Sequence, residues 1–176
     1  MTNRNKETEV ITQDQVRNLF TYRDGTLLWK TKLARCVRIG REAGHLENKG
    51  YIRVVIDKRA YPIHRVVFLY HHGYLPEFID HKDGNRSNNL IENLRACTAA
   101  DNQHNKKGQS RKWAKITSKW KGVCWLPPRN RWIARIRFDY KLKFLGHFVN
   151  EDDAARAYNT AAKIYFGEFA RLNAVD

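Results

Sequence analysis

The chain has 176 residues, and its 33 Lys and Arg residues outnumber 18 Asp and Glu to give a formal net charge of +15. Hydrophobic residues make up 42% of the sequence, which excludes a largely disordered chain and allows one large domain or two small ones. Such an excess of like charge repels itself in a compact fold, and the usual compensation is a polyanionic partner. The charge therefore favours nucleic-acid binding, although a merely soluble basic protein has the same signature.

The cysteine and hydropathy patterns narrow the class of protein further. Cys36, Cys97 and Cys124 form no CxxC pair, which argues against a disulfide framework or a zinc site and favours reduced thiols inside a cell. The polar N-terminus has no apolar core of a signal peptide, and no apolar run approaches the roughly 20 residues that span a bilayer. We expect a soluble intracellular protein without a membrane partner.

A short helix and a hairpin are predicted at the start of the chain, after a polar and frayed segment at residues 1–10. Thr12 can cap a helix whose apolar residues share one face, namely Val16, Leu19 and Phe20. The run TYRDGTLLW then predicts a hairpin around Asp24-Gly25.

A strand and a longer helix follow. YIRVVI at residues 51–56 predicts a strand, and a turn is expected at residues 57–59. Pro62 suits the first turn of a helix that runs through His72. We interpret residues 11–75 as a small α+β layer that supports the segment after it.

The central segment, IDHKDGNRSNNLIENLRACTAADNQHNKK at residues 79–107, combines two strands and a helix with polar side chains. A strand is expected to end at Asp80-His81, a second strand lies around 94–97, and Thr98 can cap a helix that contains Asn102. His81, Asn93 and Asn102 recur at intervals of 12 and 9 residues (93 − 81 and 102 − 93). An isolated DG or NN pair would indicate only a turn, but the whole spaced set favours a catalytic site.

Phosphodiester hydrolysis needs a deprotonated water and stabilisation of charge on the phosphate. A neutral histidine such as His81 can take the proton, and a hard divalent cation held by oxygen ligands can stabilise the charge. Asp80 offers a carboxylate and Asn102 an amide oxygen, while Asn93 is suited to hold the loop by hydrogen bonds to the backbone. Because neighbouring residues of a strand point to opposite faces, Asp80 and His81 can serve one site only if the strand twists, bulges or ends there.

This segment resembles the HNH (ββα-metal) nuclease motif, in the subtype of phage and intron-encoded homing endonucleases. The resemblance implies that His81 is the general base, Asp80 and Asn102 are metal ligands, and Asn93 is the central Asn that braces the loop. The third motif position is Asn102 rather than His, which that subtype tolerates. The implied metal is Mg²⁺, with Mn²⁺ equally suited to oxygen ligands, and the zinc-supported branch does not fit because its cysteine pairs are missing.

The last third of the chain is strongly basic. Between residues 106 and 147 there are thirteen Lys or Arg and one acid, Asp139, which favours a surface that faces phosphates. Residues 106–117 have the composition of a basic linker. Strands are expected at 121–125, 131–138 and 143–148, and a helix with Asp153 in a capping-box position is expected to run from Asn150 to Gly167.

Residues 118–176 resemble the Apetala/ethylene-response-factor DNA-binding domain, through KGVCW, RWIARIRF, FLGHF, DAARAYNTAA and GEFARLN. In that family a three-stranded sheet packed on one helix lies in the major groove. Strand alternation separates an apolar face of residues 131–138 from a face with three arginines. The predicted DNA contacts are Lys121, Arg131, Arg135, Arg137, Lys143 and Phe144. Cys124, Leu126 and Leu142 stand where plant members often carry arginine, so the plant target sequence is not transferred.

The predicted fold is therefore α+β, with an HNH nuclease domain at 1–105 (core motif 79–105), a basic linker at 106–117 and a DNA-binding domain at 118–176. The predicted function is metal-dependent hydrolysis of double-stranded DNA by a homing-type endonuclease of phage-infected bacteria. No small-molecule cofactor is expected, and the protein is expected to be a monomer or weak homodimer. The alternative is a non-catalytic DNA-binding regulator that keeps a vestigial nuclease unit.

Overall fold

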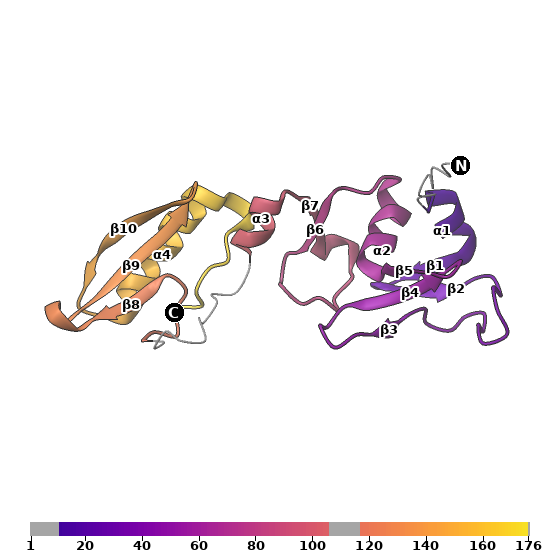
Figure 1. Cartoon of the computed structure of the whole chain (residues 1–176), viewed down its shortest axis with the longest axis horizontal. Helices are drawn as coiled ribbons and strands as arrows, with labels where there is room; N and C mark the ends of the chain where they lie inside the picture. Colours follow the sequence, from indigo (N-terminus) through magenta and orange to yellow (C-terminus); the bar gives the residue numbers. More distant parts are fainter. Residues whose placement is uncertain (1–10, 106–116, 176) are drawn as a thin grey trace, which may run out of the picture. The chain divides into compact units, whose positions relative to one another are not determined.

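The computed structural model describes residues 11–105 and 117–175, shown in Figure 1. The chain divides into two compact units between Cys97 and Thr98. The sequence had placed the end of the first domain at residue 105, whereas helix α3 (Ala99–His104) belongs to the second unit. The predicted frayed start at 1–10 lies outside the described residues, as does the predicted linker except for residue 117. No helix in the described ranges is long and apolar enough to cross a membrane.

The first unit begins with helix α1 (Gln13–Leu19) and the hairpin of β1 (Phe20–Arg23) and β2 (Thr26–Trp29). Thr12 caps α1 as predicted, because its hydroxyl accepts from the Gln15 backbone N–H while the Gln15 side chain accepts from the Thr12 N–H. Phe20 opens β1 instead of extending the helix. The hairpin turn at Asp24-Gly25 has positive φ at both residues, 46° and 81°, which confirms the predicted tight turn.

A three-stranded antiparallel sheet follows, with the order β3-β4-β5. It consists of β3 (His45–Leu46), β4 (Ile52–Ile56) and β5 (Arg59–Pro62), and β5 leads directly into helix α2 (Ile63–His72). The predicted strand and helix are confirmed, with Pro62 as the residue before α2. The two short strands β3 and β5 were not predicted, because two- and four-residue segments with polar side chains carry no periodic signal and form only by pairing with β4.

Strands β6 (Phe78–His81) and β7 (Leu94–Cys97) pair in an antiparallel ladder, as the sequence predicted, and a loop with a 3₁₀ turn at Ile91–Asn93 joins them. One hydrophobic core holds this ladder to the N-terminal layer. Its buried residues include Val16 of α1, Leu27 of β2, Val67 of α2 and the ladder residues Ile79 and Leu94. The N-terminal layer therefore forms the support for β6 and β7 that the sequence predicted.

The second unit contains a three-stranded antiparallel sheet in the order β10-β9-β8 and the long helix α4 (Glu151–Phe166), which packs on one face of the sheet in Figure 1. The strands are β8 (Val123–Leu126), β9 (Arg131–Phe138) and β10 (Lys141–Phe148), with 3₁₀ turns at Pro127–Arg129 and Gly167–Phe169. Small side chains allow the helix to lie close to the sheet, since Ala154, Ala155 and Ala162 are fully buried.

The start of α4 differs in one detail from the prediction. Asn150 is the N-cap residue, but its side chain donates to Asp153 Oδ2 at 3.2 Å and caps no backbone N–H, so the predicted capping box was wrong. Three acidic residues in the first turn, Glu151, Asp152 and Asp153, still lie where the positive end of the helix dipole favours them. Gly167 ends the helix as predicted.

Candidate active site and nucleic-acid interface

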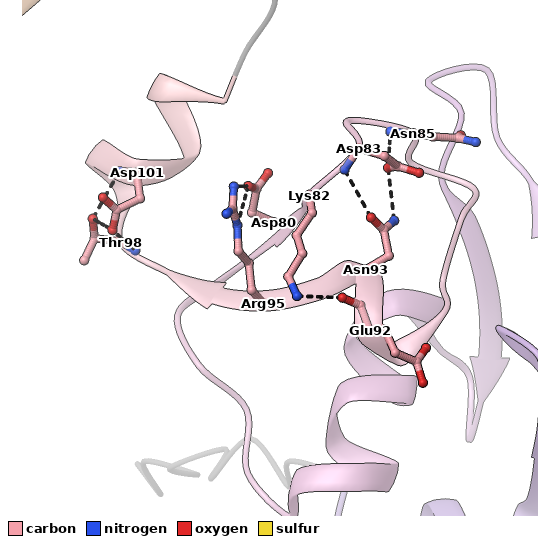
Figure 2. Close-up of polar contacts among 9 residues, drawn as sticks. All are labelled: Asp80, Lys82, Asp83, Asn85, Glu92, Asn93, Arg95, Thr98 and Asp101. Carbon is pink, nitrogen blue, oxygen red and sulfur yellow. Dashed lines mark hydrogen bonds and ion pairs between the residues drawn. The ribbon is translucent and has the colours of Figure 1, made fainter. Parts of the chain in front are cut away.

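The β6–β7 ladder brings a buried carboxylate and a guanidinium together. Asp80 is opposite Arg95, and Arg95 donates to Asp80 Oδ2 from Nε at 3.2 Å and from Nη2 at 2.8 Å, as Figure 2 shows. The two side chains are only 8% and 10% exposed. The pair therefore orients the Asp80 carboxylate through two charge-assisted hydrogen bonds.

His81 is the next residue and ends the strand. It is 5% exposed, and its Nε2 lies 3.1 Å from Oδ1 of Asn89, whose side chain is also buried. Asn89 Nδ2 donates to the carbonyl of Ser87, which can only accept, so Oδ1 is the atom that faces His81. The neutral His81 ring accordingly carries its proton on Nε2 and its lone pair on Nδ1, the nitrogen able to take a proton from water.

Two aromatic neighbours pack against His81 from elements of the same unit. The ring of His64 on α2 lies 5.1 Å from that of His81 in an edge-on arrangement, and the ring of Tyr51 lies 6.3 Å away. Burial lowers the pKa of His81, although the hydrogen bond that its ring donates to Asn89 acts in the opposite direction. Burial, helped by the nearby His81 and Arg65, lowers the pKa of His64 to about 3. Both rings are therefore neutral at pH 7, the state that a general base requires.

The loop between β6 and β7 is held by Asn93 and Asp83 (Figure 2). The Asn93 side chain accepts from the Asp83 backbone N–H at 3.1 Å and donates to the Asp83 carboxylate at 3.0 Å and to the Asn88 carbonyl at 2.8 Å. Asp83 also accepts from Asn85 and Asn88. Hydrogen bonds of Asn93 thus brace the loop in the way the sequence predicted. Desolvation raises the pKa of Asp83, but the hydrogen bonds from the Asn85 backbone N–H and from the side chains of Asn88 and Asn93 lower it more, so the net shift is downward.

The β6–β7 ladder shows how the side chains of Asp80 and His81, which are neighbours on one strand, are oriented. The register runs from Phe78 opposite Cys97 to His81 opposite Leu94 without a shift, so the two side chains leave opposite faces of a regular strand. The strand ends at His81, which is one of the three conditions named above. The chain turns directly after His81, where the Gly84 N–H donates to the His81 carbonyl.

Asn102, the predicted second metal ligand, lies on α3 in the second unit. Thr98 caps this helix as predicted, because its hydroxyl accepts from the Asp101 N–H and the Asp101 carboxylate accepts from the Thr98 N–H and hydroxyl. The boundary between the units separates Asn102 from Asp80. Their joint binding of one metal therefore stays a prediction.

The residues predicted to bind a metal, Asp80 and Asn102, offer oxygen atoms as ligands. Within the described ranges no three side chains among His, Cys, Asp and Glu gather as a metal site. One carboxylate, that of Asp80, together with an amide oxygen fits Mg²⁺, because this ion keeps several of its waters and uses few protein ligands. The donor set is thus compatible with Mg²⁺ or Mn²⁺ chemistry.

The second unit presents the predicted arginine face. Along β9 the residues Arg131, Arg135 and Arg137 are exposed, while Ala134 and Ile136 are buried against α4. Phe144 of β10 is opposite Arg135 and is 58% exposed, so it shares the arginine face. The strand alternation that the sequence predicted for β9 is confirmed.

Two of the predicted DNA contacts lie elsewhere. Lys143 is opposite the buried Ile136, and its ammonium donates to the Tyr165 hydroxyl of α4 at 3.3 Å, so it lies on the helix side of the sheet and its contact with DNA stays a prediction. Neighbouring strand residues alternate, and Phe144 already occupies the outer face. Lys121 is partly buried beside Gly122 and Tyr158, and burial together with Arg171 lowers its pKa to about 8.

Comparison with known proteins identifies the family. Residues 61–104, which contain α2, the β6–β7 ladder and its loop, match the model of an HNH endonuclease family. The chain is also 31% identical over 137 residues to an uncharacterised HNH endonuclease of Acanthamoeba polyphaga mimivirus, an alignment that covers 75% of this chain and 67% of the relative. The protein belongs to the HNH endonuclease family.

Three residues with close contacts in this site were not singled out by the sequence. They are Asn89 and His64, which contact His81, and Arg95, which contacts Asp80. Arg95 could have been identified from the sequence, because pairing the two predicted strands in register places it opposite Asp80. Nothing in the sequence reveals that Asn89 turns inward to His81.

Proposed function

We propose that this protein is a metal-dependent endonuclease that hydrolyses double-stranded DNA and prefers certain sites, in the manner of homing-type HNH enzymes. Membership of the HNH endonuclease family supports the nuclease activity. The observation that carries the proposal is the buried His81, held in one neutral form by Asn89 at the end of β6. The net charge of +15 supports DNA as the substrate.

His81 is the proposed general base. Its Nδ1 accepts the proton of the attacking water while the Nε2–H bond to Asn89 stabilises the ring as it becomes charged. The braced loop fixes the position of both residues, because Asn93 and Asp83 link the start of the loop to its end. A preorganised base of this kind lowers the barrier by avoiding reorientation during the reaction.

Asp80 and Asn102 are the proposed ligands of Mg²⁺ or Mn²⁺, which supplies charge stabilisation at the phosphate when bound. In this role Arg95 orients the Asp80 carboxylate through its two hydrogen bonds. It also supplies a positive charge near the site where the phosphate must lie.

The second unit is proposed to hold the DNA. Its exposed Arg131, Arg135 and Arg137 can contact phosphates or guanine edges, with Phe144 beside them. This arrangement supports the resemblance to the Apetala/ethylene-response-factor domain, in which the sheet enters the major groove. An enzyme that prefers certain sites needs a DNA-binding unit joined to its nuclease unit. The DNA-binding unit supplies affinity and fixes the position of the nuclease unit along the DNA.

Cleavage of supercoiled plasmid with Mg²⁺ tests the proposal. The wild-type protein and a His45→Ala control, which removes an exposed histidine of the same unit, should convert plasmid to the nicked form, because one HNH site cuts one strand per event. His81→Ala should bind the plasmid with unchanged affinity and lose cleavage by at least a hundredfold. Binding without cleavage by the wild type on every DNA offered would favour the alternative, a DNA-binding regulator.

A further inference from the structure

The outer face of the β8–β10 sheet mixes arginines with exposed apolar side chains. Strand register places the following nine residues on this face: Cys124 and Leu126 of β8, Arg131, Ile133, Arg135 and Arg137 of β9, and Leu142, Phe144 and His147 of β10. None of the nine is acidic. A β-bulge between Phe144 and Gly146 keeps Phe144 and His147 on the same face, and their rings lie 4.9 Å apart.

Each of the two most exposed apolar residues of this face is the cross-strand partner of an arginine. Leu142 is 54% exposed and opposite Arg137, and Phe144 is 58% exposed and opposite Arg135. Opposite residues of an antiparallel pair have Cβ atoms about 5 Å apart. An apolar group and a guanidinium therefore reach outward side by side at two successive positions along the sheet.

We propose that Leu142 and Phe144 read the 5-methyl groups of thymine in the major groove of duplex DNA while the neighbouring arginines hold the phosphates and guanine edges. The inference rests on the proposed DNA-binding function of this face and adds the base that it recognises. The thymine methyl is the apolar group that base pairs present in the major groove, so apolar side chains beside arginines match it chemically.

The size and charge of the face support duplex DNA as its occupant. Strands lie about 4.8 Å apart, so the outer strands β8 and β10 are separated by roughly 10 Å, which fits a major groove about 12 Å wide. Arg129 adds a fourth guanidinium at the margin, where it lies 3.0 Å from His147 Nε2. RNA fits less well, because its bases lack the methyl group and its major groove is too narrow for side chains to read.

The test compares thymine with uracil in otherwise identical duplexes. The full-length protein is used without divalent metal to select bound duplexes from a randomised library, and the selected duplexes are then remade with deoxyuridine in place of thymidine. The selected pool should contain thymine at defined positions. Loss of the methyl groups should weaken binding about fourfold for each contacted methyl, the effect of exposing one buried methyl-sized group.

Variants of Leu142 and Phe144 test whether these two residues cause the preference for thymine over uracil. Leu142→Ala combined with Phe144→Ala should bind the thymine and uracil duplexes equally, while Ile164→Ala, which removes an exposed apolar residue of α4 in the same unit, should keep the wild-type preference. The comparison of the two duplexes with wild-type protein does not depend on the folding of any variant. Equal binding of both duplexes by the wild type, or a thymine preference that persists in the double variant, would overturn thymine reading.

The proposed function and the inference fail in different ways. If Arg135→Ala weakens binding but thymine and uracil duplexes bind equally, the face contacts DNA without reading the methyl group. If the wild-type protein binds no duplex at all, the proposed DNA-binding function fails and the inference fails with it.

Discussion

The partly buried His64 predicts a specific loss of stability at mildly acidic pH. Its pKa in the folded protein is about 3, while an exposed histidine of an unfolded chain has a pKa of about 6.5. Because the folded value is depressed, the unfolded state binds a proton that the folded state does not as the pH falls below 6.5. Stability is therefore lost progressively between pH 6.5 and about pH 3.

The size of the effect follows from the two pKa values. At pH 5 the unfolded histidine is almost fully protonated, 1.5 units below its pKa, and the folded one is still neutral. One pKa unit corresponds to about 1.4 kcal/mol, so His64 should reduce the free energy of unfolding by about 2 kcal/mol between pH 7.5 and pH 5. His64→Gln removes this term, because glutamine of similar size cannot take up the proton.

The assay is urea unfolding of the full-length protein at both pH values, followed by amide signals of Val54 and Val67 in two-dimensional NMR. Both residues are buried in the core of the first unit, so their signals report that unit alone. The pH-dependent loss should be smaller in His64→Gln than in the wild type by about 2 kcal/mol, while His45→Gln at an exposed position should behave as the wild type does. An equal loss in His64→Gln and wild type would refute the reasoning.

Three further predictions test the contacts around the site. Gly25→Ala should destabilise the first unit by about 2–4 kcal/mol, since a Cβ there would lie 2.9 Å from the Leu90 backbone nitrogen at φ +81°, whereas Gly40→Ala, at φ +78° with no atom within 4 Å, should cost only about 1 kcal/mol in the same urea assay. Equal costs would show that the hairpin does not support the loop. Arg95→Met should cost about 3–5 kcal/mol by leaving Asp80 buried without its ion pair, and adding Asp80→Leu should restore most of the unfolding free energy; no recovery would contradict the account of this pair. Asn89→Leu should shift the ¹⁵N NMR signals of the His81 ring away from a single Nε2-protonated form and slow plasmid nicking by at least tenfold, and an unchanged ring spectrum would contradict the assigned role of Asn89.

Local patterns in the sequence determined several elements that the structure contains. Asp24-Gly25 tolerates the positive φ values of a tight hairpin turn, and the hydroxyl of Thr12 satisfies an orphan N–H at the start of α1. Alternation along β9 separates Arg135 from Ile136 whatever the partner strand is. These features depend on atoms only a few residues apart, so the chain specifies them without knowledge of the tertiary fold.

Partners that are distant in sequence were decided by tertiary packing. The ring of His64 lies against His81 only because the shared core packs α2 against the β6–β7 ladder. Asn89 turns inward because the loop around it is closed by hydrogen bonds across ten residues, between Asp83 and Asn93. Alternation alone excludes one of Lys143 and Phe144 from the arginine face, but the register with β9 decides which one. The sequence by itself thus determined the family motif and the faces of its strands, whereas contacts that close long loops depend on packing that no local pattern encodes.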